Sequence, residues 1–236
     1  MSENKRSEKR VRRTKIAIER DVLKAVDSLI EEVGFSNITL TGVAERAKIE
    51  PAVFYRRYAN LEELFDKYTH KYDYWFGDIL QNIPKNLSQE EGFYWVMEKL
   101  IGALYHNKGM QQLLKWELVE DNQITRRTAR LRESINEPLI RLLEYKFQGS
   151  GLDINVIAAN VIAGIYYLIL HRKRSKFCDV DFTSRQGKAR LSNGIKQLID
   201  LLFEKVANEQ RITQIAEKLK AEGVSEEIIA RCVQQY

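Results

Sequence analysis

Residues able to contact DNA are concentrated in one short stretch of this sequence. Residues 55–58 read Tyr-Arg-Arg-Tyr, and guanidinium and phenol groups are common donors to phosphate oxygens. They end the second of two short helical segments, over about residues 39–47 and 51–58. The two segments are separated by a turn of about three residues, which is the spacing of a helix-turn-helix. This combination predicts DNA binding.

The residues before this stretch are strongly basic. Within the first fifteen residues, only Glu3 and Glu8 oppose Lys5, Arg6, Lys9, Arg10, Arg12, Arg13 and Lys15. Such a run is either a solvated tail or an arm that contacts phosphates or enters the minor groove. Because the run directly precedes the helix-turn-helix, we favour the arm and expect Arg12 and Arg13 to contact DNA.

The helix-turn-helix also predicts which side chains are buried and which are exposed. The second helix is too short to be stable alone, so neighbouring helices must hold it. The expected core residues are Val43, Ala44, Ala47, Ile49 and Phe54, and the expected exposed residues are Glu50, Pro51, Ala52, Val53, Tyr55, Arg56 and Arg57.

Individual roles follow from side-chain chemistry. Ala52 and Val53 can touch a thymine methyl group, and Glu50 can accept a hydrogen bond from a cytosine amino group. Arg57 can bind phosphate, with Arg56 beside it. The N-terminus of the first helix, at Thr39 to Thr41, offers free N–H groups and a hydroxyl to another phosphate. Tyr58 is expected to pack between helices.

Composition bounds the fold class. The chain has 236 residues, a net charge of +5, three prolines and twelve glycines. Apolar residues recur with helical spacing through most of it, and no stretch alternates at period two, so we expect an all-α protein. Cys178 and Cys232 form no metal or disulfide framework, and the polar, charged N-terminus is unlike a signal peptide. A cytoplasmic protein without cofactor or metal is expected.

Capping signals place the helices. Helix boundaries are expected at Gly34, at Thr39, at Asn60 with Glu63, at Pro84 and at Ser88 with Glu91. The expected helices are 14–33, 39–47, 51–58, 60–83, 88–106, 110–119, 123–147 with a kink or split at Pro138, 153–175 and 186–208, followed by the segments 212–219 and 228–233.

Residues 154–170 are the most apolar run of the chain. A membrane span is one interpretation, but the run is slightly short and contains Asn155, Asn160 and Gly164. We favour a helix buried in a core or in a subunit interface, and we expect no membrane partner.

Residues 35–64 resemble the DNA-binding signature of the TetR family of bacterial transcriptional regulators. The matching features are Phe35 after Gly34, Thr39, Val43-Ala44, Ala47, Phe54-Tyr55, Tyr58 and Leu64. The motif resemblance covers roughly residues 14–66, and the remainder is similar in architecture only. The resemblance implies that Tyr55 contacts phosphate.

Three positions depart from the family pattern. This sequence has Lys48 where the family usually has Gly, and Glu50 where the family usually has Ser or Thr. It has Leu61 where the family usually has a lysine that binds phosphate. Loss of that lysine is expected to weaken backbone contact, for which Arg56, Arg57 and the N-terminal arm can compensate.

The chain is expected to have four parts, of which the last is extra to a minimal member of the family that it resembles. These are a basic arm over 1–13, a helix-turn-helix domain over 14–60, a helical ligand-binding and dimerisation domain over 61–208 and a helical hairpin over 209–236. The resemblance also implies a homodimer on a palindromic operator of double-stranded DNA, since two copies reach successive major grooves. Residues 153–175 and 186–208 would form the dimer interface.

A small-molecule effector is the third expected partner. Large aromatic residues are frequent between 75 and 167, and they form either a largely apolar effector pocket or an ordinary core. The pocket candidates are Trp75, Trp116, Tyr166 and His171.

The protein is therefore expected to be a repressor that a small, largely apolar effector releases from DNA. The alternative is a DNA-binding protein of the same fold, without a small-molecule effector, that a protein partner controls through residues 209–236. We expect no enzyme, because His70, His106 and His171 lie far apart and no nucleophile or phosphate-loop motif is present.

Overall fold

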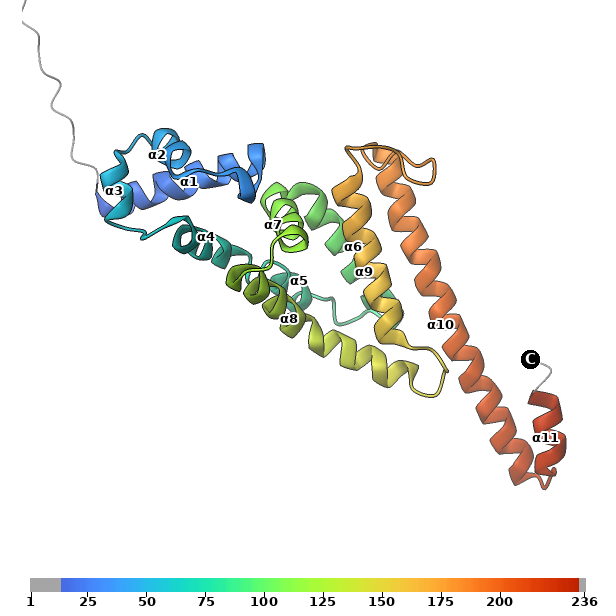
Figure 1. Ribbon diagram of the computed structural model, residues 1–236. Helices are drawn as coiled ribbons and strands as arrows, with labels where there is room; N and C mark the ends of the chain where they lie inside the picture. Colours follow the sequence, from blue (N-terminus) through green and yellow to red (C-terminus); the bar gives the residue numbers. More distant parts are fainter. Residues whose placement is uncertain (1–13, 234–236) are drawn as a thin grey trace, which may run out of the picture. The chain divides into compact units, whose positions relative to one another are not determined.

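The computed structural model describes residues 14–233, and helices joined by loops make up this part of the chain (Figure 1). Phe177 and Val180 form an isolated β-bridge in a loop. The elements are α1 (Lys15–Val33), η1 (Phe35–Asn37), α2 (Leu40–Ala47), α3 (Pro51–Tyr55), α4 (Leu61–Thr69), η2 (His70–Tyr72), α5 (Gly77–Gln81), α6 (Gln89–His106), α7 (Lys108–Val119), α8 (Gln123–Phe147), α9 (Ile154–His171), α10 (Arg185–Ala221) and α11 (Glu226–Val233). The expected all-α class is confirmed.

The chain divides into two compact units. The first unit contains residues 14–73 and 108–129, and the second contains residues 74–107 and 130–233. Each unit is therefore assembled from two separate parts of the sequence. The helix α8 is continuous and contributes residues to both units.

Local capping signals explain where several helices begin and end. Thr14, Thr39 and Asn60 each accept a hydrogen bond from a backbone N–H of the first helical turn, and Ser88 with Glu91 forms a complete capping box. Gly34 ends α1 with a φ of 77°, a left-handed value that favours glycine.

An aromatic cluster forms the core of the first unit. Phe35 stacks on Trp116 of α7 with ring centroids 4.5 Å apart, and Phe65 of α4 meets both rings edge to face. Val22, Val26 and Ile30 of α1 are fully buried. The aromatic cluster packs η1, α4 and α7 together, and α1 contacts α2, α7 and η1.

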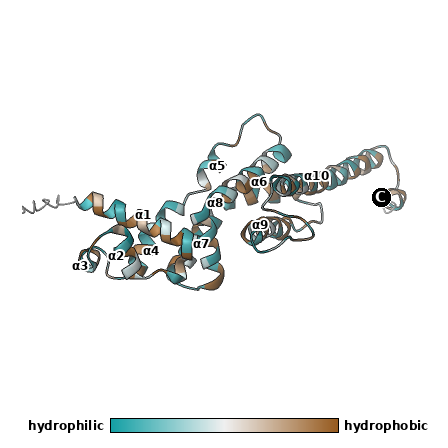
Figure 2. Cartoon of the chain, turned by 90° about the horizontal axis from the view of Figure 1, so that it is seen from above, coloured by the Kyte–Doolittle hydropathy of each residue, from teal (hydrophilic) through white to brown (hydrophobic). Residues whose placement is uncertain are grey.

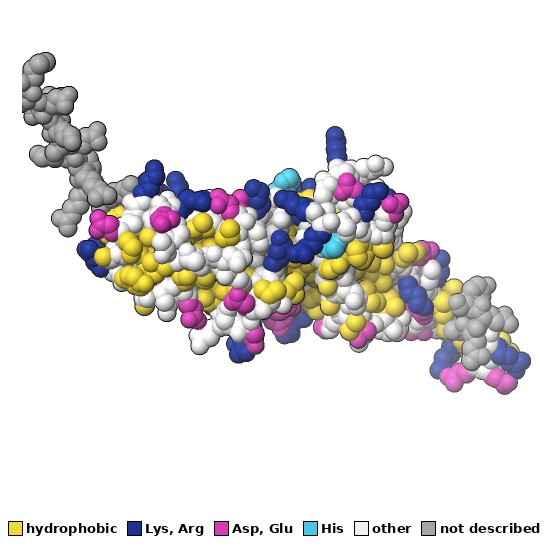
Figure 3. All heavy atoms as spheres, turned by 45° about the horizontal axis from the view of Figure 1, so that its top comes forward, with side chains coloured by type: hydrophobic (Ala, Val, Ile, Leu, Met, Phe, Trp, Pro, Cys, Tyr) yellow, Lys and Arg dark blue, Asp and Glu magenta, His cyan; other side chains and the backbone are white. Residues whose placement is uncertain are grey.

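The second unit is built around α6, α9 and α10, which contact one another through α6. Much of α9 is hydrophobic (Figure 2), and Figure 3 shows a broad hydrophobic area where this helix lies. This helix is long and apolar enough to cross a membrane, and only 28% of it is buried within the chain. Most of this apolar helix is therefore not covered by the chain itself.

Several expected helices differ from the observed ones, and α3 ends at Tyr55 instead of reaching residue 58. The expected helix over 60–83 is divided into α4, η2 and α5, because Arg127 and Thr69 bond the carbonyl of Asp66 and so satisfy the end of α4. The expected break near Asn208 is absent, and α10 is continuous from Arg185 to Ala221. Pro138 lies inside α8 without splitting it.

Candidate DNA-reading surface and effector cavity

The turn between α2 and α3 is tight and depends on one left-handed residue. Lys48 ends α2 with φ 54° and ψ 48°, and its N–H donates to the carbonyl of Glu45 at 3.0 Å. The N–H of Ile49 donates to the carbonyl of Ala44 at 2.9 Å. These bonds satisfy the end of α2 and set the direction of α3.

The core positions of this motif are occupied as expected. Val43, Ala44, Ala47 and Phe54 are buried, and Ile49 is half-buried. Tyr58 is also buried, as expected for a packing residue, with its ring centroid 5.3 Å from that of Phe54. Burial raises the pKa of its hydroxyl, which keeps the side chain neutral.

The outer side of α3 carries the predicted reading residues. Glu50 precedes the helix, Pro51 occupies its first turn, and Ala52, Tyr55 and Arg56 are exposed. The side chain of Tyr55 is 59% exposed. Small apolar and long polar side chains thus share one short face, a composition that suits a major groove.

Val53 and Arg57 are half-buried along one edge of an open cleft. The same cleft is lined by Lys15 and Lys67, and by Glu19 as its single carboxylate. Glu19 forms an ion pair with Lys67, which raises the pKa of the ammonium group. The cleft has an excess of positive charge beside α3, as required for a phosphate backbone.

The start of α2 is the second place where a phosphate contact is predicted. Thr39 caps the helix through a 3.1 Å hydrogen bond from the N–H of Gly42, and Thr41 is exposed in the first turn. The first N–H groups of a helix have no intrahelical acceptor and carry partial positive charge. Both threonines are therefore placed where the sequence required them.

An ion pair holds α2 against α1. The guanidinium of Arg46 donates to both carboxylate oxygens of Glu32 at 2.8 Å and to the hydroxyl of Ser28 at 2.6 Å. The hydrogen bonds from Arg46, with a further one from Ser28, lower the pKa of Glu32 to about 2. Arg12 and Arg13, the remaining DNA-binding candidates, lie outside the described residues.

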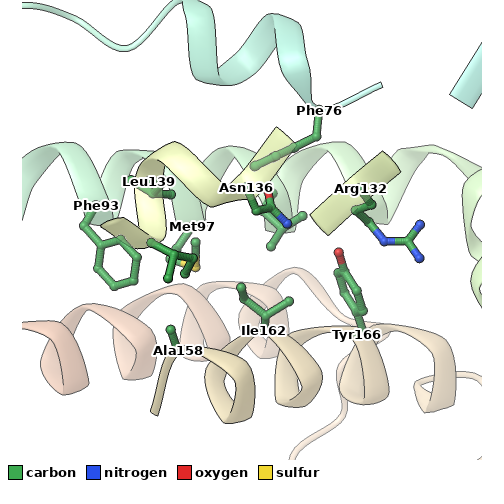
Figure 4. A pocket seen from close by; sticks show the side chains of 11 residues that line it. Phe76, Phe93, Met97, Arg132, Asn136, Leu139, Ala158, Ile162 and Tyr166 are labelled. Carbon is green, nitrogen blue, oxygen red and sulfur yellow. The ribbon is translucent and has the colours of Figure 1, made fainter. Parts of the chain in front are cut away.

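The second unit contains a narrow, mostly apolar cavity between α6, α8 and α9 (Figure 4). Its volume is about 20 Å³, which is room for about one water molecule. Met97 and Leu100 of α6 and Ala158 and Ile162 of α9 form its apolar wall. A ligand larger than water can enter only when these helices or side chains move.

Polar groups gather at one end of this cavity. Arg132 and Asn136 lie one turn apart on α8, and the hydroxyl of Tyr166 points toward them from α9 (Figure 4). Phe93 and Leu139 lie at the opposite end. The cavity therefore has a polar end and an apolar end.

The structure does not bring the four predicted pocket residues together. Tyr166 lines the cavity, whereas Trp116 belongs to the aromatic core of the first unit. Trp75 is half-buried beside Phe76, and His171 stacks on Tyr167 and bonds the hydroxyl of Ser175 at 2.8 Å.

Sequence reasoning missed Arg132 and Asn136. A signal was present: these two polar residues share one face of α8 with Leu139, Ile140 and Leu143. A polar pair in line with an apolar stripe indicates a lined cavity more directly than the abundance of aromatic residues does.

This arrangement of caps, turn and exposed face defines a helix-turn-helix DNA-binding protein. Residues 22–68 match the sequence model of the tetR family of bacterial regulatory proteins. The resemblance to the TetR family is thereby confirmed, and the chain is a transcriptional regulator with a TetR-family DNA-binding domain. Among curated protein sequences, none matches the chain significantly.

Solved structures share most of the fold at low sequence identity. The fatty acid degradation regulator FadR from Bacillus halodurans has 17% identity and a TM-score of 0.58, covering 79% of this chain and 96% of its own. FadR from Bacillus subtilis, solved in complex with stearoyl-CoA, has 16% identity and a TM-score of 0.57, with 76% and 96% covered. A TetR family transcription regulator from Marinobacter aquaeolei has 16% identity and a TM-score of 0.53, with 75% and 95% covered.

Proposed function

We propose that the protein is a cytoplasmic, dimeric repressor that reads a palindromic DNA operator and is released by a largely apolar effector. The observation that carries the proposal is the outer face of α3, where Ala52, Tyr55 and Arg56 are exposed beside a basic cleft. No residue set with a catalytic arrangement is part of this proposal.

The dimer is supported by an apolar face of the second unit that the chain itself leaves uncovered. Val156 and Tyr167 of α9 and Leu198 and Leu201 of α10 are exposed at helical spacing. Gly164 of α9 lies on this side, and a Cβ atom placed there would meet nothing within 4 Å. Packing within one subunit therefore does not require a glycine at this position. Close packing of a helix from a second subunit would require one.

Effector control is supported by the closed cavity. Because the space between α6, α8 and α9 is so small, binding must displace helices and so favours a different conformation. FadR from Bacillus subtilis was solved with stearoyl-CoA, which carries a long apolar chain. We infer that an apolar effector shifts the population away from the DNA-binding state.

The direct test is selection of bound duplexes from a random DNA library at low and near-physiological salt. Specific binding predicts enrichment of a palindrome that survives the higher salt. Unenriched binding that is lost at the higher salt would contradict the proposal.

A protein partner is a second candidate regulator. Ile215 near the end of α10 and Ile228 of α11 are both about half exposed. Thermal stabilisation by members of a ligand panel supports the small-molecule effector. Its absence, together with loss of regulation when residues 209–236 are deleted, supports the partner.

A further inference from the structure

A second cavity lies beside the first one within the second unit. It has a volume of about 160 Å³ and lies between α6, α8 and α10, lined by Gly92, Leu143 and Phe203 among others. Phe93 and Leu139 line both cavities. These two side chains therefore form a wall that the two cavities share.

The two cavities follow one line along α8. Arg132 belongs to the first cavity and Lys146 to the second, and these residues are about 21 Å apart along a helix that rises 1.5 Å per residue. On α6 the order is reversed, from Leu100 at the first cavity to Ser88 at the second. The two cavities thus follow one another along α8, and the α8 residues that line them between Asn136 and Lys146 are apolar.

We propose that the two cavities together bind one long, unbranched acyl chain, with its carboxyl or thioester oxygen at the Arg132 end. This proposal rests on the proposed effector control and specifies its ligand class. A narrow, apolar passage excludes ring systems and branched molecules, whereas a flexible chain can pass Phe93 and Leu139 by small rotations of these side chains.

The position of the head group follows from the polar residues. Arg132, Asn136 and Tyr166 approach the same end of the first cavity from two helices (Figure 4). Guanidinium, amide and phenol groups all donate hydrogen bonds to carbonyl or carboxylate oxygens. The opposite end of the first cavity offers only Phe93 and Leu139, so the chain extends in that direction into the second cavity.

Two glycines of α6 provide a matched test. A Cβ at Gly92 would contact Ile83 at an ordinary 3.8 Å. Gly92 lines the second cavity and not the first. The variant Gly92→Leu therefore fills the second cavity and leaves the first unchanged. At Gly102, on the same helix, a Cβ meets nothing within 4 Å. The variant Gly102→Leu controls for the gain in helix propensity.

The experiment measures binding of hexanoate, decanoate and hexadecanoate to the full-length protein by calorimetry, below their micellar concentrations. In the wild-type protein, affinity is expected to rise by up to about fourfold per added methylene group along this series. Gly92→Leu is expected to remove the gain between decanoate and hexadecanoate, whereas Gly102→Leu keeps it. A length dependence that is the same in both variants would overturn the proposal.

The head group is tested with hexadecanoate, its methyl ester and palmitoyl-CoA. Arg132→Gln is expected to weaken hexadecanoate at least tenfold, and Arg130→Gln, at an exposed neighbouring position, is expected to leave it unchanged. Tighter binding of palmitoyl-CoA than of hexadecanoate identifies the thioester as the source of the chain. Equal effects of both substitutions would overturn the head-group assignment.

The proposed function can fail separately from this inference. If hexadecanoate binds with the expected length dependence but leaves DNA affinity unchanged, the acyl-chain site stands and effector release is wrong. If a selected palindrome is bound but no acyl compound binds, the regulator stands and the acyl-chain site is wrong.

Discussion

Arg127 donates to both carboxylate oxygens of Asp73, at 2.8 and 2.7 Å. The same guanidinium donates to the hydroxyl of Thr69 at 2.8 Å, and the side chain of Asp73 is only 8% exposed. The first turns of α8 are therefore fixed to the segment that follows α4. Arg132, five residues later on the same continuous helix, lines the proposed effector cavity.

This pair is expected to contribute to stability. In Arg127→Met, Asp73 keeps a nearly buried charge without its main partner, which is expected to cost about 2 kcal/mol of unfolding free energy. The control is Arg126→Met, because Arg126 pairs with Asp121 where both side chains are mostly exposed. Denaturant unfolding measures both variants, and equal losses would contradict the role assigned to Arg127.

The turn of the helix-turn-helix offers a stabilising substitution. Lys48 has a φ of 54°, and a left-handed conformation costs a residue with a Cβ atom roughly 1 kcal/mol. Lys48→Gly is therefore expected to raise the unfolding free energy by about that amount. Lys48→Ala removes the charge and keeps the Cβ, so it is expected to give no such gain. A gain shared by both variants would assign the effect to charge instead.

The ion pair between Glu32 of α1 and Arg46 of α2 predicts a pH dependence of stability. Glu32 has an ordinary pKa of 4.5 and a folded pKa of about 2, so folding favours its ionised form. Its stabilising effect is complete above pH 4.5 and is lost as the pH falls toward 2. Glu32→Gln is expected to show a smaller loss of melting temperature across this window than the wild-type protein does.

Thermal scans between these two pH values test that expectation, with Glu62→Gln at an exposed position of α4 as the control. Parallel pH profiles for the wild type and Glu32→Gln would show that the Glu32–Arg46 ion pair does not cause the loss of melting temperature at low pH.

Local signals explain why the helix boundaries around the candidate DNA-reading surface could be predicted from the sequence. Thr39, Gly34 and Pro51 act through the backbone of their own turn, so their meaning does not depend on distant residues. Tyr58 was expected to pack between helices, and it is buried beside Phe54 although it lies beyond the end of α3.

The effector cavity could not be predicted in the same way. Tyr166 was named, but Arg132 comes from another helix and meets it only through tertiary packing. Trp116 shows the converse. Its aromatic side chain suggested a ligand pocket, but it stacks on Phe35 in the core of the first unit. These two residues come from different segments of the sequence, 108–129 and 14–73. An aromatic residue alone does not distinguish a cavity wall from a core.

Two substitutions separate positioning from reading of the DNA. Arg57→Ala is expected to weaken binding to all sequences alike and to lower the salt slope by about 1, as loss of one phosphate contact does. Val53→Ala is expected to change base preference more than the salt slope. Binding titrations over a salt series on the selected palindrome and its single-base variants measure both. A base-specific effect of Arg57→Ala, or an unchanged preference in Val53→Ala, would contradict these roles.

The central claim is that two copies of the chain, joined through α9 and α10, read two half-sites. The most direct measurement is the stoichiometry and affinity of the wild type and of Leu201→Glu on the selected palindrome. Leu201 is 63% exposed on α10, and Leu118, 80% exposed on α7, provides the matched Leu118→Glu control. We predict two subunits per palindrome for the wild type and the control, and a monomer with at least tenfold weaker binding for Leu201→Glu. Tight binding of a single subunit, unaffected by Leu201→Glu, would contradict the account.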